Sequence, residues 1–327
     1  MPMLSFRDAI RSALIEEMHR SPAMFVIGED LIPQGGSFGV HKGLAEMFPG
    51  RILQTPISEA AIVGVAVGGA LAGGPVVAEI MFSDFMTCCM DEIVNQAAKL
   101  RYMSGGQARV PLVVRTPCGL GKGIGAQHSQ ALEAFYMHVP GLQVAVPATP
   151  ADAKGLLKTA LRSRDPTIFL EYKLLYAIEG EVPDDPDFTI PFGKARVHRQ
   201  GEDVTIVATG RMVHFALTAA QTLAAEGIDA EVIDPRTLSP LDLDTLTASV
   251  KKTARAVVVD EAVVTCSPAS EIAASLSETC FGWLDAPIKR VASPHVPKPF
   301  TPVLESLSVP DVAAILVAVR GICKARS

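Results

Sequence analysis

Short apolar runs alternate with amphipathic helical segments along the whole chain, and this alternation constrains the fold more than any other feature. Runs such as 76–81, 112–115 and 204–208 have the length of buried strands, and longer stretches with helical spacing of apolar residues separate them. Strands that alternate with helices are typical of α/β folds, because each helix returns the chain to the same end of a parallel sheet. The sequence therefore predicts an α/β protein.

The segment 177–191, AIEGEVPDDPDFTIP, is acidic, contains three prolines and lacks periodicity. Segments of this kind commonly separate domains. We therefore predict a first domain over 1–180, a linker over 181–192 and a second, smaller α/β domain over 193–327. Further strands are expected at 24–27, 143–146, 167–171, 231–234, 256–260 and 288–291. Helices are expected after a capping Ser5, over 58–72, over 83–103 and after Thr149-Pro150.

Charge and hydropathy exclude several classes of function. The net charge is −6 and no basic stripe is present, so we expect no nucleic-acid partner. The longest apolar stretches, 60–72 and 309–319, are too short to span a bilayer, and the N-terminus lacks the features of a signal or transit peptide. Six cysteines show no metal-binding spacing and are expected to be free thiols. We expect a cytoplasmic protein with no membrane association.

Several motifs, in the same order and over essentially the whole chain, resemble the β subunits of pyruvate, branched-chain 2-oxo acid and acetoin dehydrogenase complexes. They are GED at 28–30, TPISEAAIVGVAVGGALAG at 55–73, EIMFSDF at 79–85, DEIVNQAAKLRYMSGG at 91–106, GAQHSQ at 125–130, VPATPADAKGLL at 146–157 and PHVPKPFTP at 294–302. The resemblance implies a pyrimidine-binding domain for thiamine diphosphate, followed by a transketolase C-terminal-like α/β domain.

Glu59 matches the cofactor glutamate of this family. A carboxyl group in an apolar site, hydrogen-bonded to N1′ of the pyrimidine, favours the imino tautomer that activates C2 of thiamine. From the residues alone, a glutamate in the first turn of a helix is equally well explained by the helix dipole. The resemblance also implies that Ile57, Met81 and Phe85 line the pyrimidine, with Phe85 against the ring face. The alternative for these three residues is an ordinary place in the core.

His128 follows a loop with glycines at 119, 121, 123 and 125, which leave the backbone free to adapt around a ligand. A histidine titrates near neutrality, so it can donate a proton to a substrate carbonyl oxygen. The alternative is a histidine hydrogen-bonded within a turn. The context AQHSQ matches the family's catalytic histidine, and we predict that His128 is catalytic. The loop lacks the patterns of a P-loop or a dinucleotide fingerprint.

The chain has no GDG motif, which in this family helps to hold the Mg²⁺ that anchors the diphosphate. The resemblance therefore implies that an α subunit holds Mg²⁺ and the diphosphate end of the cofactor, in an α2β2 heterotetramer.

The resemblance also implies a structural K⁺ bound mainly by backbone carbonyls, at positions that correspond to Leu112, Ala160, Leu161, Ser163 and Asp165. Ser163 and Asp165 depart from a common family pattern of Asp and Asn. A capped helix end without an ion is the alternative.

The family cleaves a carbon–carbon bond beside a carbonyl group and passes the acyl fragment to a lipoyl group on an acyltransferase core. The segments FLEYKLLY, DEAVVTCSPASEIAA and ASPHVPKPFTP resemble acetoin dehydrogenase β subunits more than the pyruvate or branched-chain enzymes, so we favour acetoin as the substrate. Pyruvate and branched-chain 2-oxo acids remain alternatives.

Two rival classes of protein are a transketolase-like enzyme that has lost its first half and a non-catalytic scaffold that docks the acyltransferase core.

Overall fold

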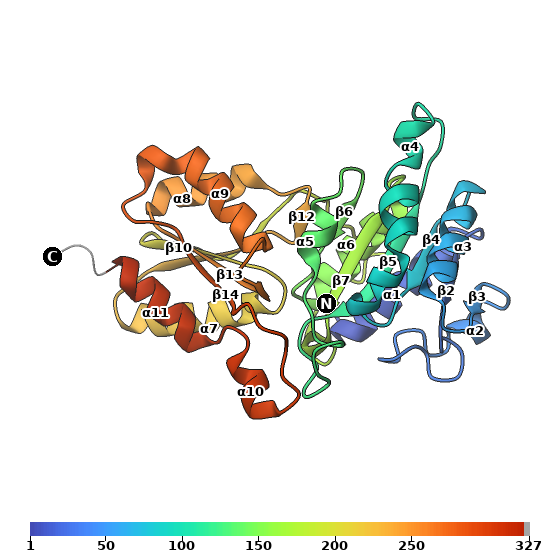
Figure 1. Cartoon of the computed structure of the whole chain (residues 1–327), viewed down its shortest axis with the longest axis horizontal. Helices are drawn as coiled ribbons and strands as arrows, with labels where there is room; N and C mark the ends of the chain where they lie inside the picture. Colours follow the sequence, from blue (N-terminus) through green and yellow to red (C-terminus); the bar gives the residue numbers. More distant parts are fainter. Residues whose placement is uncertain (324–327) are drawn as a thin grey trace. The chain divides into compact units, whose positions relative to one another are not determined.

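The computed structural model describes residues 1–323, which divide into two compact units (Figure 1). The first unit comprises Met1–Cys118 and Phe135–Phe192, and the second comprises Gly119–Ala134 and the chain from Gly193 onward. Each unit contains a largely parallel sheet with helices, so the predicted α/β class is confirmed. The glycine-rich segment that carries His128 belongs to the second unit.

The sheet of the first unit has strands in the order β6-β7-β5-β4-β2-β3, each parallel to its neighbours. Every residue of β5 and β7 is buried, as expected for central strands of a parallel sheet. A short antiparallel pair, β1 with β8, lies outside this sheet. The strands are β1 (Met3–Ser5), β2 (Phe25–Gly28), β3 (Ile52–Gln54), β4 (Val76–Glu79), β5 (Leu112–Cys118), β6 (Gln143–Ala145), β7 (Thr167–Tyr172) and β8 (Glu179–Glu181).

Capping residues begin the long helices of the first unit where the sequence predicts them. The side chain of Ser5 accepts a hydrogen bond from the Asp8 N–H at 3.0 Å, and Thr149 does the same for the Asp152 N–H at 3.2 Å. The helical elements are α1 (Phe6–Arg20), α2 (Leu44–Met47), α3 (Glu59–Leu71), η1 (Ser83–Cys89), η2 (Glu92–Ala97), α4 (Leu100–Met103), α5 (Glu133–Met137), α6 (Pro150–Arg162) and η3 (Lys173–Leu175). Helix α1 packs on α6, and α3 packs on η1 and η2.

The stretch 83–103 is not the single α-helix that the sequence predicts. It consists of a 3₁₀ segment (η1), a π segment (η2) and one α-helical turn (α4). Its buried residues Met86, Cys89, Ile93 and Ala97 recur at three- and four-residue spacing. That spacing predicts a helix with one buried face, but it does not distinguish the hydrogen-bond patterns of 3₁₀, α and π helices.

The sheet of the second unit has strands in the order β14-β13-β10-β11-β9, parallel except for β9. Helices α8 and α9 cover one face and α7 and α11 the other (Figure 1). The strands of this sheet are β9 (Arg196–Arg199), β10 (Val204–Ala208), β11 (Ala230–Asp234), β13 (Ala256–Val263) and β14 (Lys289–Ser293), and β12 (Thr237–Ser239) lies outside it. The helical elements are α7 (Met212–Ala225), α8 (Leu243–Thr253), α9 (Pro268–Cys280), η4 (Phe281–Trp283), α10 (Pro302–Leu307) and α11 (Val312–Cys323).

The apolar stretch Pro302–Cys323 is long and apolar enough to cross a membrane, judged by length and composition alone. In the structure it comprises two helices, α10 and α11. Helix α11 buries Ile315, Val319 and Ile322 and packs against α7, β13 and β14. One face of α11 therefore packs on the second sheet, while Val317 on the same helix is 69% exposed.

Candidate active site

Glu59 is the first residue of α3, and its side chain is half-buried. Ahead of it, the Thr55 N–H donates to the Gly28 carbonyl at 2.9 Å, which holds the segment before α3 against the carboxyl end of β2. Ligands of open α/β sheets bind at the carboxyl ends of the strands. Glu59 therefore lies at the edge of the first unit's sheet where a cofactor is expected.

A second acid, Glu29, follows β2 and is only 9% exposed. Burial raises the pKa of the Glu29 carboxyl, and the negative charges of Glu59, Asp30 and Glu79 raise it further. Its Oε2 atom has no hydrogen-bond partner among the described residues. Sequence analysis assigned Glu29 no role, although a carboxylate directly after a buried strand was the available signal. The pair Glu29 and Glu59 thus places a carboxyl group with a raised pKa beside a second carboxyl group.

The thiol of Cys89 also lies within the electrostatic reach of Glu59. Burial raises its pKa to about 12, with further contributions from the charges of Glu92 and Glu59. A thiol is nucleophilic only as the thiolate, so Cys89 remains an unreactive thiol at neutral pH. The reactive groups of this region are therefore its carboxyl groups.

The three residues expected to line the pyrimidine differ in exposure. Ile57 is 76% exposed, so it is not a core residue of the described chain. Met81 and Phe85 are half-buried and follow β4. The Ser37 hydroxyl donates a hydrogen bond to the Met81 sulfur. These apolar side chains lie at the edge of the sheet that also carries the two acids, and we call this edge the rim. Its composition suits an aminopyrimidine, which has apolar faces and a nitrogen that binds a carboxyl group.

A buried cluster of charges lies next to this rim. Arg115 on β5 binds Glu171 on β7 through two hydrogen bonds of 2.7 Å, and its Nη1 donates to Glu79 on β4 at 2.9 Å. Glu79 and Arg115 are register partners on adjacent strands, which explains their proximity. His41 hydrogen-bonds Glu79, and the hydroxyl of Tyr176 donates to Glu171 at 2.7 Å.

These pairings have clear electrostatic consequences. The charges of His41 and Arg115 lower the pKa of Glu79 although its burial acts in the opposite direction. Burial raises the pKa of Tyr176 well above its ordinary value. The cluster therefore favours the carboxylate form of Glu79 and the neutral form of Tyr176. No local sequence pattern indicates that His41 has a partner 38 positions away.

His128 lies in the loop of the second unit and is half-buried. The Gly119 N–H donates to the Gln130 carbonyl at 2.9 Å, which closes the loop at its base. The His128 N–H donates to the Gly125 carbonyl at 3.3 Å. Glu59 and His128 thus belong to different units.

The residues expected at a cation site lie in the first unit. Leu112 begins β5, Ala160 and Leu161 are in the last turn of α6, and Ser163 is the C-terminal cap of that helix. The Ser163 N–H donates to the Ala160 carbonyl at 3.1 Å, and the Asp165 N–H donates to the Ser163 hydroxyl at 3.1 Å. The capped-end alternative thus accounts for these bonds, and the Ser163 hydroxyl also donates to Gln143 at 3.0 Å.

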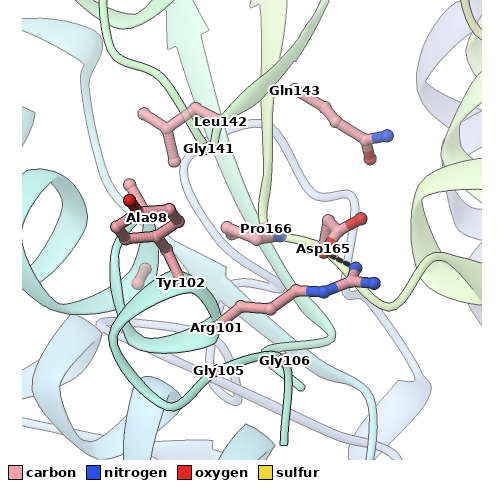
Figure 2. Close-up of a pocket in the computed structure, with 11 residues that line it drawn as sticks. Ala98, Arg101, Tyr102, Gly105, Gly106, Gly141, Leu142, Gln143, Asp165 and Pro166 are labelled. Carbon is pink, nitrogen blue, oxygen red and sulfur yellow. Dashed lines mark hydrogen bonds and ion pairs between the residues drawn. The ribbon is translucent and has the colours of Figure 1, made fainter. Parts of the chain in front are cut away.

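A pocket of about 690 Å³ lies beside this helix end, within the first unit (Figure 2). Figure 2 shows Arg101 reaching from the helical segment to Asp165, with which it forms an ion pair, and the ring of Tyr102 rising beside it. Tyr102 is 89% exposed. This pocket contains none of the residues expected to bind the pyrimidine, so it is separate from the candidate active site.

Comparisons with known proteins agree with this geometry. Residues 2–179 match the family described as transketolase, pyrimidine binding domain, and residues 193–315 match transketolase, C-terminal domain. The chain is 50% identical to the β subunit of acetoin:2,6-dichlorophenolindophenol oxidoreductase from Cupriavidus necator, over 98% of each chain. It is 45% identical to the pyruvate dehydrogenase E1 component subunit β of Rhizobium meliloti, over 99% of this chain and 70% of that one.

Among solved structures, a split-gene transketolase described as an inactive β4 tetramer is similar, with a TM-score of 0.81, 26% identity and 99% of both chains covered. Fold and site thus define a transketolase-type pair of domains. Within that class, the chain belongs to the family of β subunits of thiamine-diphosphate-dependent acetoin and 2-oxo acid dehydrogenases. The resemblance seen in the sequence is confirmed.

Proposed function

We propose that this chain is the β subunit of a dehydrogenase that cleaves acetoin and transfers the acetyl group to a lipoyl carrier. The observation that carries this proposal is the pair of acids, Glu59 and the buried Glu29, at a rim that also holds the exposed Ile57. The similarity to an acetoin oxidoreductase β subunit supports the choice of substrate. The similarity to pyruvate dehydrogenase supports pyruvate as the second candidate.

Thiamine diphosphate, when bound, supplies the carbanion that attacks the substrate carbonyl group. In this proposal the carboxyl group of Glu59 would hydrogen-bond N1′ of the pyrimidine, and Glu29, whose pKa is raised by burial, lies close to it. Ile57, Met81 and Phe85 cover the pyrimidine and exclude water. His128 donates a proton to the substrate oxygen as a general acid.

The proposal includes a partner, because the chain lacks the GDG motif that helps to hold Mg²⁺. We assign Mg²⁺ and the diphosphate to an α subunit in an α2β2 heterotetramer, with a lipoyl-bearing acyltransferase core as the acyl acceptor. A structural K⁺ is proposed at the carbonyl groups of Leu112, Ala160, Leu161, Ser163 and Asp165. We further propose a cytoplasmic location and domain limits of 1–180 and 193–327, joined by a linker over 181–192.

Replacing Glu59 by glutamine tests the proposal, because the amide keeps the size of the side chain but not its acidity. Reconstituted with its α subunit, the Glu59→Gln variant is expected to lose at least about 100-fold in kcat, the scale of general acid–base catalysis. Steady-state rates with acetoin, pyruvate and a branched 2-oxo acid measure both the loss and the substrate preference.

The control is Glu278→Gln, at an exposed position of α9, which should leave every rate unchanged. An unaltered rate in Glu59→Gln would favour the non-catalytic scaffold. Turnover of a branched 2-oxo acid without turnover of acetoin would contradict the proposed substrate.

A further inference from the structure

The loop that carries His128 has a tightly defined backbone. Gly123 has a φ of +82°, a conformation that L side chains rarely adopt, and a Cβ at this position would lie 3.2 Å from the Phe300 carbonyl oxygen. Together with the bond that closes the loop at Gly119, these features hold the glycines in a specific path. The glycines therefore permit a close approach of the chain around residue 300, rather than only making the loop flexible.

Two buried carboxylates bind the backbone of this loop. Glu261 on β13 accepts a hydrogen bond from the Leu120 N–H at 2.7 Å. Glu305 on α10 accepts the Gly123 N–H with both oxygens at 2.9 Å. Glu261 is 0% exposed and Glu305 is 5% exposed. Amide groups of surface loops usually bind water, and hydrogen bonds from an amide to a buried carboxylate are considerably stronger.

The two carboxylate residues are joined by a continuous path of buried hydrogen bonds. The Ser293 hydroxyl donates to the Glu261 carbonyl at 2.6 Å and accepts from the Lys298 ammonium at 2.7 Å. Lys298 also donates to the Ser308 carbonyl at 2.7 Å. The Ser308 hydroxyl in turn donates to the Glu305 carbonyl at 2.7 Å. Both anchors of the loop therefore belong to one connected structure, which we call the loop clamp (Glu261, Ser293, Lys298, Glu305 and Ser308).

Cations balance the charges of the loop clamp. The Nε–H of Arg211 donates to Glu261 at 2.7 Å, and Lys298 lies between the two carboxylate residues. Lys298 is itself buried, and burying a charge is unfavourable unless it is paired and hydrogen-bonded. A mere surface turn would not need buried groups of both signs, so the arrangement indicates that a fixed loop position matters.

We propose that Glu305 and Glu261, linked through Lys298, are positioning residues that hold the glycine loop so that His128 meets the substrate. This inference rests on the proposed function, in which His128 is the proton donor. A displacement of about 1 Å in a catalytic group can cost a factor of about 100 in rate, so an anchor five residues from His128 has a direct kinetic effect.

Variants of Glu305 test the loop clamp, because this side chain contacts the loop from outside it. Glu305→Ala removes the acceptor for the Gly123 N–H, whereas Glu305→Gln keeps an acceptor oxygen at the same place. Amide hydrogen exchange of residues 119–130 in the full-length chain, with and without the α subunit, reports the loop directly. Steady-state kinetics of the assembled enzyme report catalysis.

In Glu305→Ala we expect exchange of the loop amides to rise by about 10-fold or more, with unchanged exchange in β10 and β13. We expect kcat to fall by about 10- to 100-fold with little change in KM. Glu305→Gln should recover most of both losses, and Glu278→Gln should match the wild type. A purely structural role would instead raise exchange throughout the second unit and would not be rescued selectively.

The outcomes separate the two hypotheses. Unchanged loop exchange in Glu305→Ala would overturn the loop clamp whatever the chemistry of His128. Raised loop exchange with full kcat would overturn the positioning role. Full activity of His128→Ala would overturn the proposed proton donor, and with it the catalytic purpose of the clamp, while the exchange measurement would still report how the loop is held.

Discussion

The buried cluster around Arg115 in the first unit places charged side chains against one another, whereas the loop clamp of the second unit places two carboxylates against backbone N–H groups. Around Arg115, two glutamates, a histidine and a tyrosine satisfy each other next to the rim that carries Met81. Around the glycine loop, Glu261 and Glu305 instead bind N–H groups of the loop. A side-chain cluster stabilises neighbouring strands, and removing one member leaves a buried charge. A carboxylate on a loop amide determines where one short segment lies.

The largest effect is expected from Arg115→Met, which removes the cation shared by Glu79 and Glu171. Removing one partner of a buried ion pair typically costs about 3–5 kcal/mol, so the free energy of unfolding should fall by that amount. Urea unfolding followed by circular dichroism measures it. Arg101→Met is the matched control, since its ion pair with Asp165 is largely exposed and should contribute less than about 1 kcal/mol. Equal losses in the two variants would remove the distinction between cluster and surface pair.

A smaller, pH-dependent effect is expected from Lys298→Met in the loop clamp. Burial is the main cause that lowers the pKa of Lys298 to about 8, whereas an unfolded lysine titrates near pH 10.4. Between these values the unfolded chain binds more protons than the folded chain, so this lysine makes the wild type more stable as pH rises. Relative to Lys298→Met, the wild type should gain up to about 3 kcal/mol from pH 8 to pH 10.4, since one pKa unit corresponds to about 1.4 kcal/mol.

Tryptophan fluorescence reports the unfolding of the second unit, because the chain's single tryptophan, Trp283, lies in that unit. Urea unfolding followed by its fluorescence, at a series of pH values, gives the difference between the two proteins. Parallel stability curves through that window would show that Lys298 has an ordinary pKa, which would contradict the burial of its ammonium group in the loop clamp.

The sequence predicts elements well where the pattern is local. The strand at 204–208 coincides with β10, and the caps at Ser5 and Thr149 form as expected. Glu59 begins α3, as its position after Ser58 indicates. The two caps depend on bonds between residues three positions apart, and the strand is marked by its own apolar run, so both signals are local.

Interactions between distant residues could not be predicted in the same way. Glu261 lies 141 positions from Leu120, and Glu305 lies 182 positions from Gly123. Nothing in the local sequence of a glutamate at the end of a strand, or of a glutamate in a short helix, indicates that its partner is a loop amide. The cluster at Arg115 could not be predicted for the same reason, since β4, β5 and β7 meet only when the sheet forms.

The strand β8 was not predicted because three residues show no periodicity. It lies in the acidic, proline-rich stretch that the sequence suggests as a linker, and its pairing with β1 brings together segments from the two ends of the first unit. Pairing of this kind depends on which segments the folded chain brings together, and amino-acid composition does not predict it.

The central claim is that this chain binds the pyrimidine of thiamine diphosphate through Glu59 while another polypeptide holds the diphosphate. Calorimetric titration of thiamine diphosphate with Mg²⁺ into the isolated chain, into the isolated α subunit and into their mixture tests it most directly. We predict strong binding only in the mixture, and a clear loss of that binding when the chain carries Glu59→Gln. Tight binding by the isolated chain, with the same affinity as the mixture, would contradict the claim.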